Sequence, residues 1–147
     1  MNLSLRSLLR SPRETLGGYV ILPRLIDKVR LHAQGKLPAE YIPQLLAPDP
    51  ALDGRWLAFT GLDAETLRHA VLSLSTDETV LAWVERHVRP RSDAEKRAWA
   101  TAIDAYRPDA ERAQRRREIY PAVAATVDVG AISVFDLIDR DEGRLPG

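Results

Sequence analysis

Apolar residues recur along most of this chain at the spacing of one helical face. The clearest case follows Pro23, since a proline suits the first turn of a helix, where its missing N–H needs no partner. Residues three and four apart lie on the same side of a helix, so this segment predicts a helix that stops near Gly35. Its apolar face consists of Leu22, Leu25, Ile26, Val29 and Ala33.

Short polar residues indicate where the other helices begin. The side-chain oxygen of such an N-cap residue accepts a hydrogen bond from a free amide in the first turn. No alternating pattern of the kind that predicts strands is sustained. We therefore predict an all-α fold, a single compact domain of about seven helices over residues 1–147. The predicted helix starts are Asp53, Asp63, Ser75-Thr76, Ser92, Pro108-Asp109 and Ser133.

Three segments depart from the helical pattern. Residues 1–22 are predicted to form an N-terminal arm with an extended end, in which Gly17-Gly18 allows backbone angles that other residues avoid. Residues 36–52 contain four prolines and are predicted to form a loop with one helical turn. Residues 123–131 are small and apolar, and the pattern leaves both helix and strand open there.

Composition excludes several classes of function. The 147 residues have a formal net charge of zero and are 45% hydrophobic and 29% charged, which is ordinary for a soluble domain. There is no overall basic charge of the kind that indicates nucleic-acid binding. Cysteine is absent, which excludes disulfides and thiol catalysis. No apolar run approaches the roughly 20 residues that cross a membrane, and the N-terminus lacks a secretory pattern, so we expect a cytoplasmic protein.

The strongest candidate for function is the segment around Gly17-Gly18, just before the helix that starts at Pro23. A helix N-terminus attracts anions because its first amides are free, and nearby arginines would strengthen such a site. The alternative is a plain turn that folds the arm back, beside an exposed helix face on which Arg24 pairs with Asp27. The candidate ligand-binding residues are Arg13, Gly17, Gly18, Tyr19, Arg24, Asp27 and Lys28.

The densest basic run, Arg112–Arg117, is a second candidate. Arg112, Arg115 and Arg116 share one helical face, and a face of this kind would contact phosphates. Acidic residues interrupt the run, so a salt-bridged exposed helix is the favoured interpretation. These acidic residues are Asp109, Glu111 and Glu118.

No metal site and no cofactor is predicted. The three histidines fall on separate predicted helices, without the spacing of metal ligands; they are His32, His69 and His87. An acidic cluster near the C-terminus could attract a hard cation, but a solvated last helix in which Asp136 pairs with Arg140 is the favoured interpretation. The cluster consists of Asp136, Asp139, Asp141 and Glu142.

Residues 11–28 read Ser-Pro-Arg-Glu-Thr-Leu-Gly-Gly-Tyr-Val-Ile-Leu-Pro-Arg-Leu-Ile-Asp-Lys. This motif, together with the segments 55–63 and 135–144, resembles a family of small bacterial proteins catalogued as a domain of unknown function. Residues 36–52 depart from the family pattern, in which a cysteine is usual and here is missing. The resemblance implies a shape and no established activity.

We therefore predict a non-enzymatic cytoplasmic protein that binds a partner or a small anionic ligand through Gly17-Gly18 and the face of Arg24, Asp27 and Lys28. The alternative is an enzyme that acts on a phosphorylated or carboxylated metabolite at the same surface, which requires these side chains to converge in a pocket. A third hypothesis is nucleic-acid binding through Arg112–Arg117, which we do not expect at physiological salt. Self-association into a homo-oligomer is left open.

Overall fold

A tight hairpin precedes the first helix in the computed structural model, which describes residues 8–145. Strands β1 (Thr15–Leu16) and β2 (Tyr19–Val20) pair antiparallel, with Leu16 opposite Tyr19. Gly17 and Gly18 form the two-residue turn between them, with φ angles of 58° and 82°. Two consecutive positive φ angles are what a two-residue hairpin turn requires, and glycine adopts them without steric conflict. The Gly-Gly pair is thus the turn that folds the arm back.

Nine helices follow within residues 8–145, and seven of them have at least seven residues. The predicted all-α class and single domain are confirmed, apart from the small hairpin. None of these described helices is long and apolar enough to cross a membrane. The helices are α1 (Leu22–Ala33), η2 (Ala39–Gln44), α2 (Leu52–Thr60), α3 (Ala64–Ser73), α4 (Asp77–His87), α5 (Asp93–Ala105), α6 (Ala110–Ile119), α7 (Pro121–Ala124) and α8 (Val134–Asp141).

Most of the predicted helix starts are confirmed. The side chains of the N-cap residues Asp63, Thr76, Ser92, Asp109 and Ser133 each accept a hydrogen bond from an amide in the following turn. The prediction for Asp53 is wrong, because α2 begins at Leu52 and Asp53 lies inside its first turn. Its carboxylate bonds instead to Lys28 of α1, at 2.7 Å, and to the amide of Leu46.

The segments that depart from the helical pattern contain short helices and turns. The Pro-rich segment 36–52 contains η2, a single short helix, as predicted. Residues 123–131 form neither a long helix nor a strand, since α7 ends at Ala124 and turns follow it. The first part of the predicted arm, residues 1–7, lies outside the described residues.

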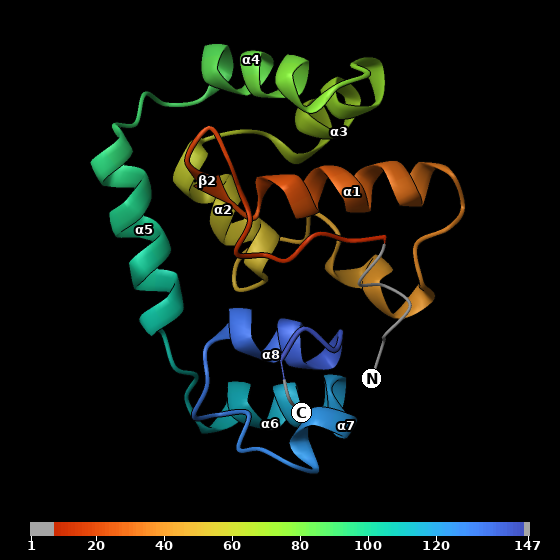
Figure 1. Ribbon diagram of the computed structural model, residues 1–147, viewed down its shortest axis with the longest axis vertical. Helices are drawn as coiled ribbons and strands as arrows, with labels where there is room; N and C mark the ends of the chain where they lie inside the picture. Colours follow the sequence, from red (N-terminus) through yellow and green to blue (C-terminus); the bar gives the residue numbers. More distant parts are fainter. Residues whose placement is uncertain (1–7, 146–147) are drawn as a thin grey trace.

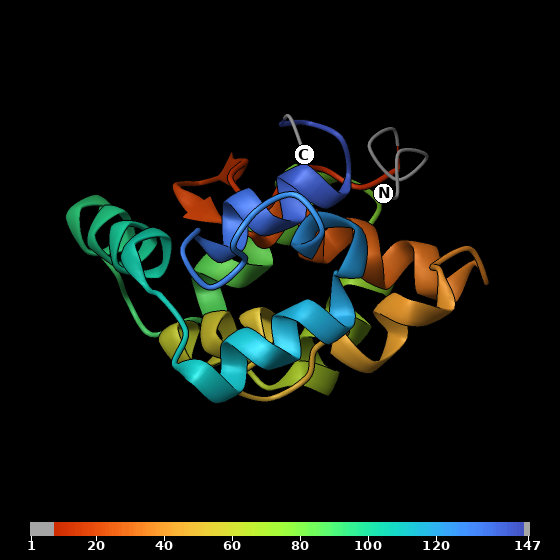
Figure 2. The ribbon, with the colours of Figure 1, turned by 90° about the horizontal axis from the view of Figure 1, so that it is seen from below.

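Helix α1 runs through the centre of the main core. Figure 1 shows α3 and α4 above it, α5 along one side, and α6, α7 and α8 in a separate layer below. Within this lower layer α8 is drawn between α1 and α6 in Figure 1, and Figure 2, seen from below, shows α6 and α8 as separate helices with α5 off to one side. The predicted face of α1 is buried except at Ala33, which is exposed, while Leu31 is buried. Leu22, Leu25, Ile26 and Val29 all have an exposed fraction of 0%.

A second, smaller apolar cluster lies under α6 and α7. Val123, Val129 and Leu137 form its centre. Helix α8 takes part in both clusters, because Phe135 packs in the main core and Leu137 in the smaller one. Helix α8 therefore connects the two layers of the molecule.

The hairpin generates a first prediction. Replacing Gly18 with alanine places a side chain at a φ of 82°, so we expect Gly18→Ala to lower the free energy of unfolding by about 1 kcal/mol or more. Urea denaturation measures the change. Thr15→Ala, on an exposed strand position of the same hairpin, is the control and should stay within about 0.5 kcal/mol of wild type. Equal stability of both variants would contradict the turn geometry.

Candidate functional site

The predicted binding face of α1 is not an open surface. Arg24 has an exposed fraction of 3% and pairs with Glu142, which lies just beyond α8. Glu142 itself has an exposed fraction of 0%. The two nitrogens of the guanidinium lie 2.9 and 2.5 Å from the two carboxylate oxygens. Lys28 is buried against Asp53, with nitrogen–oxygen distances of 2.8 and 2.7 Å. The interpretation of Arg24 and Lys28 as parts of an exposed face is therefore wrong.

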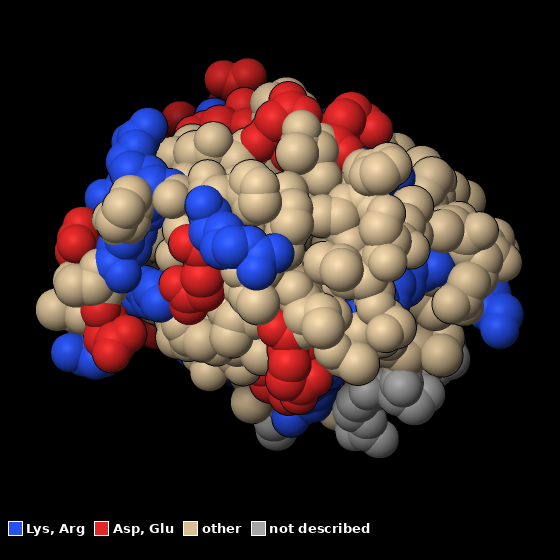
Figure 3. Space-filling model, turned by 90° about the horizontal axis from the view of Figure 1, so that it is seen from above, with Lys and Arg blue, Asp and Glu red and all other residues tan. Residues whose placement is uncertain are grey.

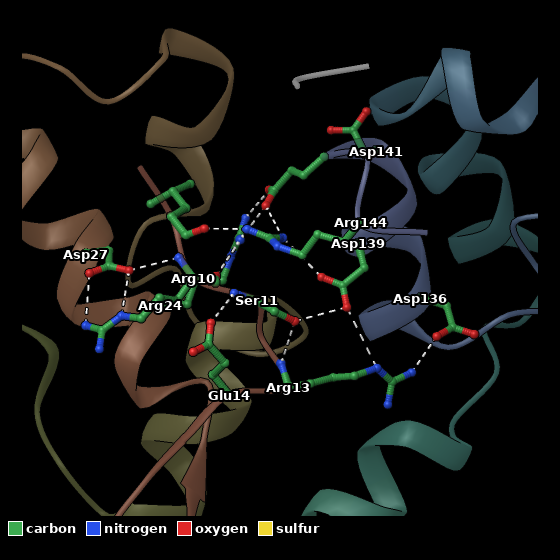
Figure 4. A network of polar contacts seen from close by, with 12 residues as sticks. Arg10, Ser11, Arg13, Glu14, Arg24, Asp27, Asp136, Asp139, Asp141 and Arg144 are labelled. Carbon is green, nitrogen blue, oxygen red and sulfur yellow. Dashed lines mark hydrogen bonds and ion pairs between the residues drawn. The ribbon is translucent and has the colours of Figure 1, made fainter. Parts of the chain in front are cut away.

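Asp27 does not pair with Arg24, as the helix spacing had suggested. Its carboxylate accepts hydrogen bonds from the backbone amide and the side chain of Arg10, in the arm that precedes the hairpin (Figure 4). Arg10 also pairs with Asp77 at the start of α4, at 2.6 Å. Arg10 thus fixes the arm against α1 and α4. In this contact a residue distant in sequence takes the place of Arg24, the predicted partner of Asp27 on the same helix.

Arg13 fastens the arm to the lower layer. It pairs with Asp104 of α5, at 3.2 Å, and with Asp136 of α8, and it lies over the ring of Phe135. Figure 4 shows Arg13 pointing away from Arg24, toward α8. The predicted Asp136–Arg140 pair is replaced by this contact, and Arg13 and Arg24 do not converge on one anion.

The acidic cluster of α8 therefore faces arginines of the same chain. Asp139 accepts hydrogen bonds from Ser11 of the arm and from Arg144 (Figure 4). Arg144 also pairs with Glu142 at 2.5 Å and donates to the carbonyl of Leu9. These contacts and those of Arg13 and Arg24 form one seam between the arm, α1 and α8, which we call the ionic seam. Among residues 8–145 no group of three or more metal-ligating side chains is found.

Tyr19 and the two glycines lie apart from Arg24. The Tyr19 ring has an exposed fraction of 2%, packs edge-on against Trp56 at 5.8 Å and lies under the ammonium of Lys96 at 4.3 Å. The same ammonium donates to the carbonyl of Gly17 at 2.8 Å. Burial raises the pKa of the Tyr19 hydroxyl, which suits a packing residue more than a proton donor.

The charges of the ionic seam shift the pKa values of their partners. Burial by itself would raise the pKa of Glu142, but the hydrogen bonds and charges of Arg24 and Arg144 outweigh it and hold that pKa below its ordinary value of 4.5. A hydrogen bond from Arg10 lowers the pKa of Asp77 below 3.8. Burial lowers the pKa of Lys28, and the attraction of Asp53 opposes that change. The carboxylates of Glu142 and Asp77 are thus more stable as anions in the folded protein than in the unfolded one.

An open cleft lies on the other side of α8. It has a volume of about 320 Å³, within the range of small-molecule sites. Its apolar floor comes from α2, α6 and α8, and its rim holds several arginines and two tyrosines. The lining residues include Leu52, Arg55, Tyr106, Arg112, Arg115, Arg116, Ile119, Tyr120, Val134, Leu137 and Ile138.

The arginines of this cleft differ in how they are compensated. Arg55 stacks on Tyr106, with 4.2 Å between the guanidinium carbon and the ring centre, and lies 4.0 Å from Asp49. Arg115 is 3.6 Å from Glu118, and both are exposed. The half-buried guanidinium of Arg112 has no hydrogen-bond or ion-pair partner among residues 8–145. A half-buried cation without a counter-charge is unfavourable and therefore marks a position at which an anion would be stabilised.

The prediction that three arginines share one face of α6 is correct, but the sequence analysis did not predict the cleft that this face lines. Arg112, Arg115 and Arg116 all line the cleft, whereas Arg117 bonds to Gln114 of the same helix. The sequence offers no local signal that α2 and α8 lie opposite this face. The lining residues of α2 precede those of α6 by more than 50 positions, and those of α8 follow them by 15 or more. Arg55 lies in one of the segments that resemble the bacterial family, which was the single hint available.

The fold and the cleft define a small helical domain with an arginine-rimmed apolar cleft. Residues 6–144 match the family described as Domain of unknown function (DUF5069), and the chain belongs to this family. The suspected family resemblance is thereby confirmed. A search of curated proteins found no match.

The buried pair generates a second prediction. The sequence alone suggested that Arg24→Ala would be nearly neutral, whereas removal of one partner of a buried ion pair strands the other charge. We expect Arg24→Ala to lower the free energy of unfolding by about 3–5 kcal/mol, and the added change Glu142→Gln to recover part of that loss. Chemical denaturation measures both. Arg117→Ala is the exposed control, and a loss as small in Arg24→Ala as in this control would restore the surface interpretation.

The lowered carboxyl pKa values generate a third prediction. A carboxylate whose folded-state pKa is depressed stabilises the protein above its unfolded pKa, and this stability is lost as the pH falls through the folded value. The free energy of unfolding should therefore decline as the pH falls below the ordinary values of 4.5 and 3.8 for Glu142 and Asp77. Asp77→Asn should make the decline shallower, and Glu78→Gln, an exposed neighbour, should not. Urea denaturation at a series of pH values tests this, and a decline equally steep in both variants would speak against it.

Proposed function

We propose that this protein is a non-enzymatic binder of small amphipathic anions, and that the cleft between α2, α6 and α8 is its binding site. The observation that carries the proposal is the half-buried Arg112, which lines the cleft without a partner among the described residues. A ligand anion would supply the missing counter-charge. Arg115, whose own partner Glu118 is exposed, can turn toward the same anion at little cost because exposed ion pairs contribute about 0–1 kcal/mol.

The floor of the cleft supports a ligand with an apolar part. Ile119 of α6 is 41% exposed, and Leu137 and Ile138 of α8 face the same space. Each square ångström of apolar area removed from water contributes about 25 cal/mol, so an aliphatic or aromatic body would add to the attraction of the arginines. The Arg55–Tyr106 stack adds a flat wall on which a ring could lie.

The first predicted surface receives less support. Arg24, Asp27 and Lys28 already have carboxylate or arginine partners, so an external anion would have to displace one of them. Binding at the Gly17-Gly18 turn stays a prediction, and it would require the ionic seam to open. The enzyme hypothesis required Arg24, Asp27 and Tyr19 to converge, and none of them lines the cleft.

Nucleic-acid binding through Arg112–Arg117 is also less supported. Asp109, Glu111 and Glu118 line a hollow that adjoins the cleft and shares Arg112 and Arg115 with it, and these carboxylates would repel a long polyanion. Figure 3 views the molecule from above, the side away from α6, and there too acidic and basic side chains are interspersed around a broad area of other residues. The charge distribution suits a compact anion inside the cleft better than an extended strand.

The proposal includes a cytoplasmic setting in a bacterium. The similarity of the motif at residues 11–28 to small bacterial proteins supports the bacterial source, and a sequence without cysteine suits a reducing compartment.

A thermal-shift screen with phosphorylated and carboxylated aromatic and aliphatic compounds tests the proposal. A ligand that binds only the folded protein stabilises it, by about 2.7 kcal/mol at a hundredfold excess over its Kd. We expect compounds with both an anionic and an apolar part to raise the melting temperature of wild type. The shift should be much smaller in Arg112→Gln and reduced in Ile119→Ser, since both side chains are partly exposed at the cleft.

Arg117→Gln, one residue beyond the cleft on the same helix, is the matched control and should respond as wild type does. Nuclear magnetic resonance mapping should place the perturbed amides on α2, α6 and α8. The proposal is wrong if no amphipathic anion binds at millimolar concentration, if Arg112→Gln binds as tightly as wild type, or if a short oligonucleotide binds more tightly than every small anion.

A further inference from the structure

Two of the four cleft arginines lack an acidic partner. Arg55 and Arg115 each have a carboxylate within 4 Å. Arg112 and Arg116 have none among residues 8–145. Both are half-buried, one helical turn apart on α6, so their positive charges are partly removed from water and close to one another.

Arg116 shows how this part of the site is built. One nitrogen of its guanidinium donates to two backbone carbonyls, those of Val129 and Ile132, at 2.8 and 2.9 Å. Carbonyls orient the guanidinium without neutralising it. Burial lowers the pKa of Arg116. The folded protein therefore holds this cation in a fixed orientation at an electrostatic cost.

We infer that the anionic group of the ligand is a dianion, and specifically a phosphate monoester, because the cleft holds two cations that are uncompensated within the described residues. This inference rests on the proposed function and specifies its ligand class. A phosphate monoester carries close to two negative charges above its second pKa of about 6 and presents three acceptor oxygens. A carboxylate or sulfonate brings a single charge and leaves one arginine without a counter-charge.

The affinity should then depend on pH through the second ionisation of the phosphate monoester, because only the dianion neutralises both arginines. The charged and titratable groups that face the anion come from the loop before α2, from α2 itself, from the segment before α6, from α6 and from the start of α7. No histidine is among the residues that line the cleft, and carboxyl groups generally titrate near 4. Burial raises the pKa of Tyr120 to about 12. These groups are Asp49, Arg55, Tyr106, Asp109, Glu111, Arg112, Arg115, Arg116, Glu118 and Tyr120.

Phenyl phosphate and benzenesulfonate are suitable probes, because they share a ring and a tetrahedral head and differ in charge. Isothermal titration calorimetry at pH 5.0 and 7.5 gives the four dissociation constants. We expect the affinity for phenyl phosphate to rise about tenfold over this range, in step with its dianionic fraction. The affinity for benzenesulfonate should change less than about twofold, and this measurement also corrects for any titration of the protein itself.

The variants link this preference to the arginines. Wild type at pH 7.5 should prefer phenyl phosphate over benzenesulfonate by about tenfold or more, as a charge-assisted hydrogen bond predicts. Arg112→Gln should bring the ratio near one, while Arg117→Gln, outside the cleft, should keep it. Inorganic phosphate alone should bind more weakly than phenyl phosphate, since it lacks the apolar part.

The outcomes separate the two proposals. If both probes bind in the cleft with equal affinity at pH 7.5, the proposed function stands and the dianion inference is wrong. If neither probe binds, both are wrong. If phenyl phosphate is preferred but the preference persists in Arg112→Gln, the phosphate is held elsewhere and the inference fails.

Discussion

The buried ion pair between Arg24 and Glu142 is the contact on which the arrangement of this molecule depends. It joins α1, at the centre of the main core, to the end of α8 across 118 residues of sequence. Two charges removed from water are tolerated only if each is fully paired, so the pair fixes one relative position of the two layers. The hydroxyl of Tyr41 also contacts Glu142, at 3.2 Å, and limits the alternatives further.

Helix α8 is consequently a helix with two different sides. Its acidic side belongs to the ionic seam, where Asp136 and Asp139 meet arginines and a serine of the arm. Its apolar side belongs to the cleft, where Leu137 and Ile138 form part of the floor. The pairing that orients one side sets the shape of the other. A change in the seam is thus transmitted to the cleft through a single rigid element.

Local chemistry explains what the sequence could predict. N-cap side chains such as Ser92 bond to amides three residues away, so their signals need no knowledge of the rest of the fold. The same reasoning failed at Asp53, because a lysine from another helix offered a stronger partner than a local amide. It failed for Arg24 and Asp27 in the same way. The face of α6 was predictable from periodicity, whereas its role depended on α2 and α8, which only tertiary packing brings opposite to it.

The contacts between the arm and α8 have a consequence for biosynthesis. Ser11 and Arg13 of the arm take their partners from α8, and those partners are synthesised 128 and 123 residues later. Contacts between residues so far apart in sequence are slow to form because a long loop must close first. A nascent chain whose synthesis has reached only α7 holds Arg24 without its carboxylate. These contacts of the amino-terminal half therefore form only after α8 has emerged from the ribosome.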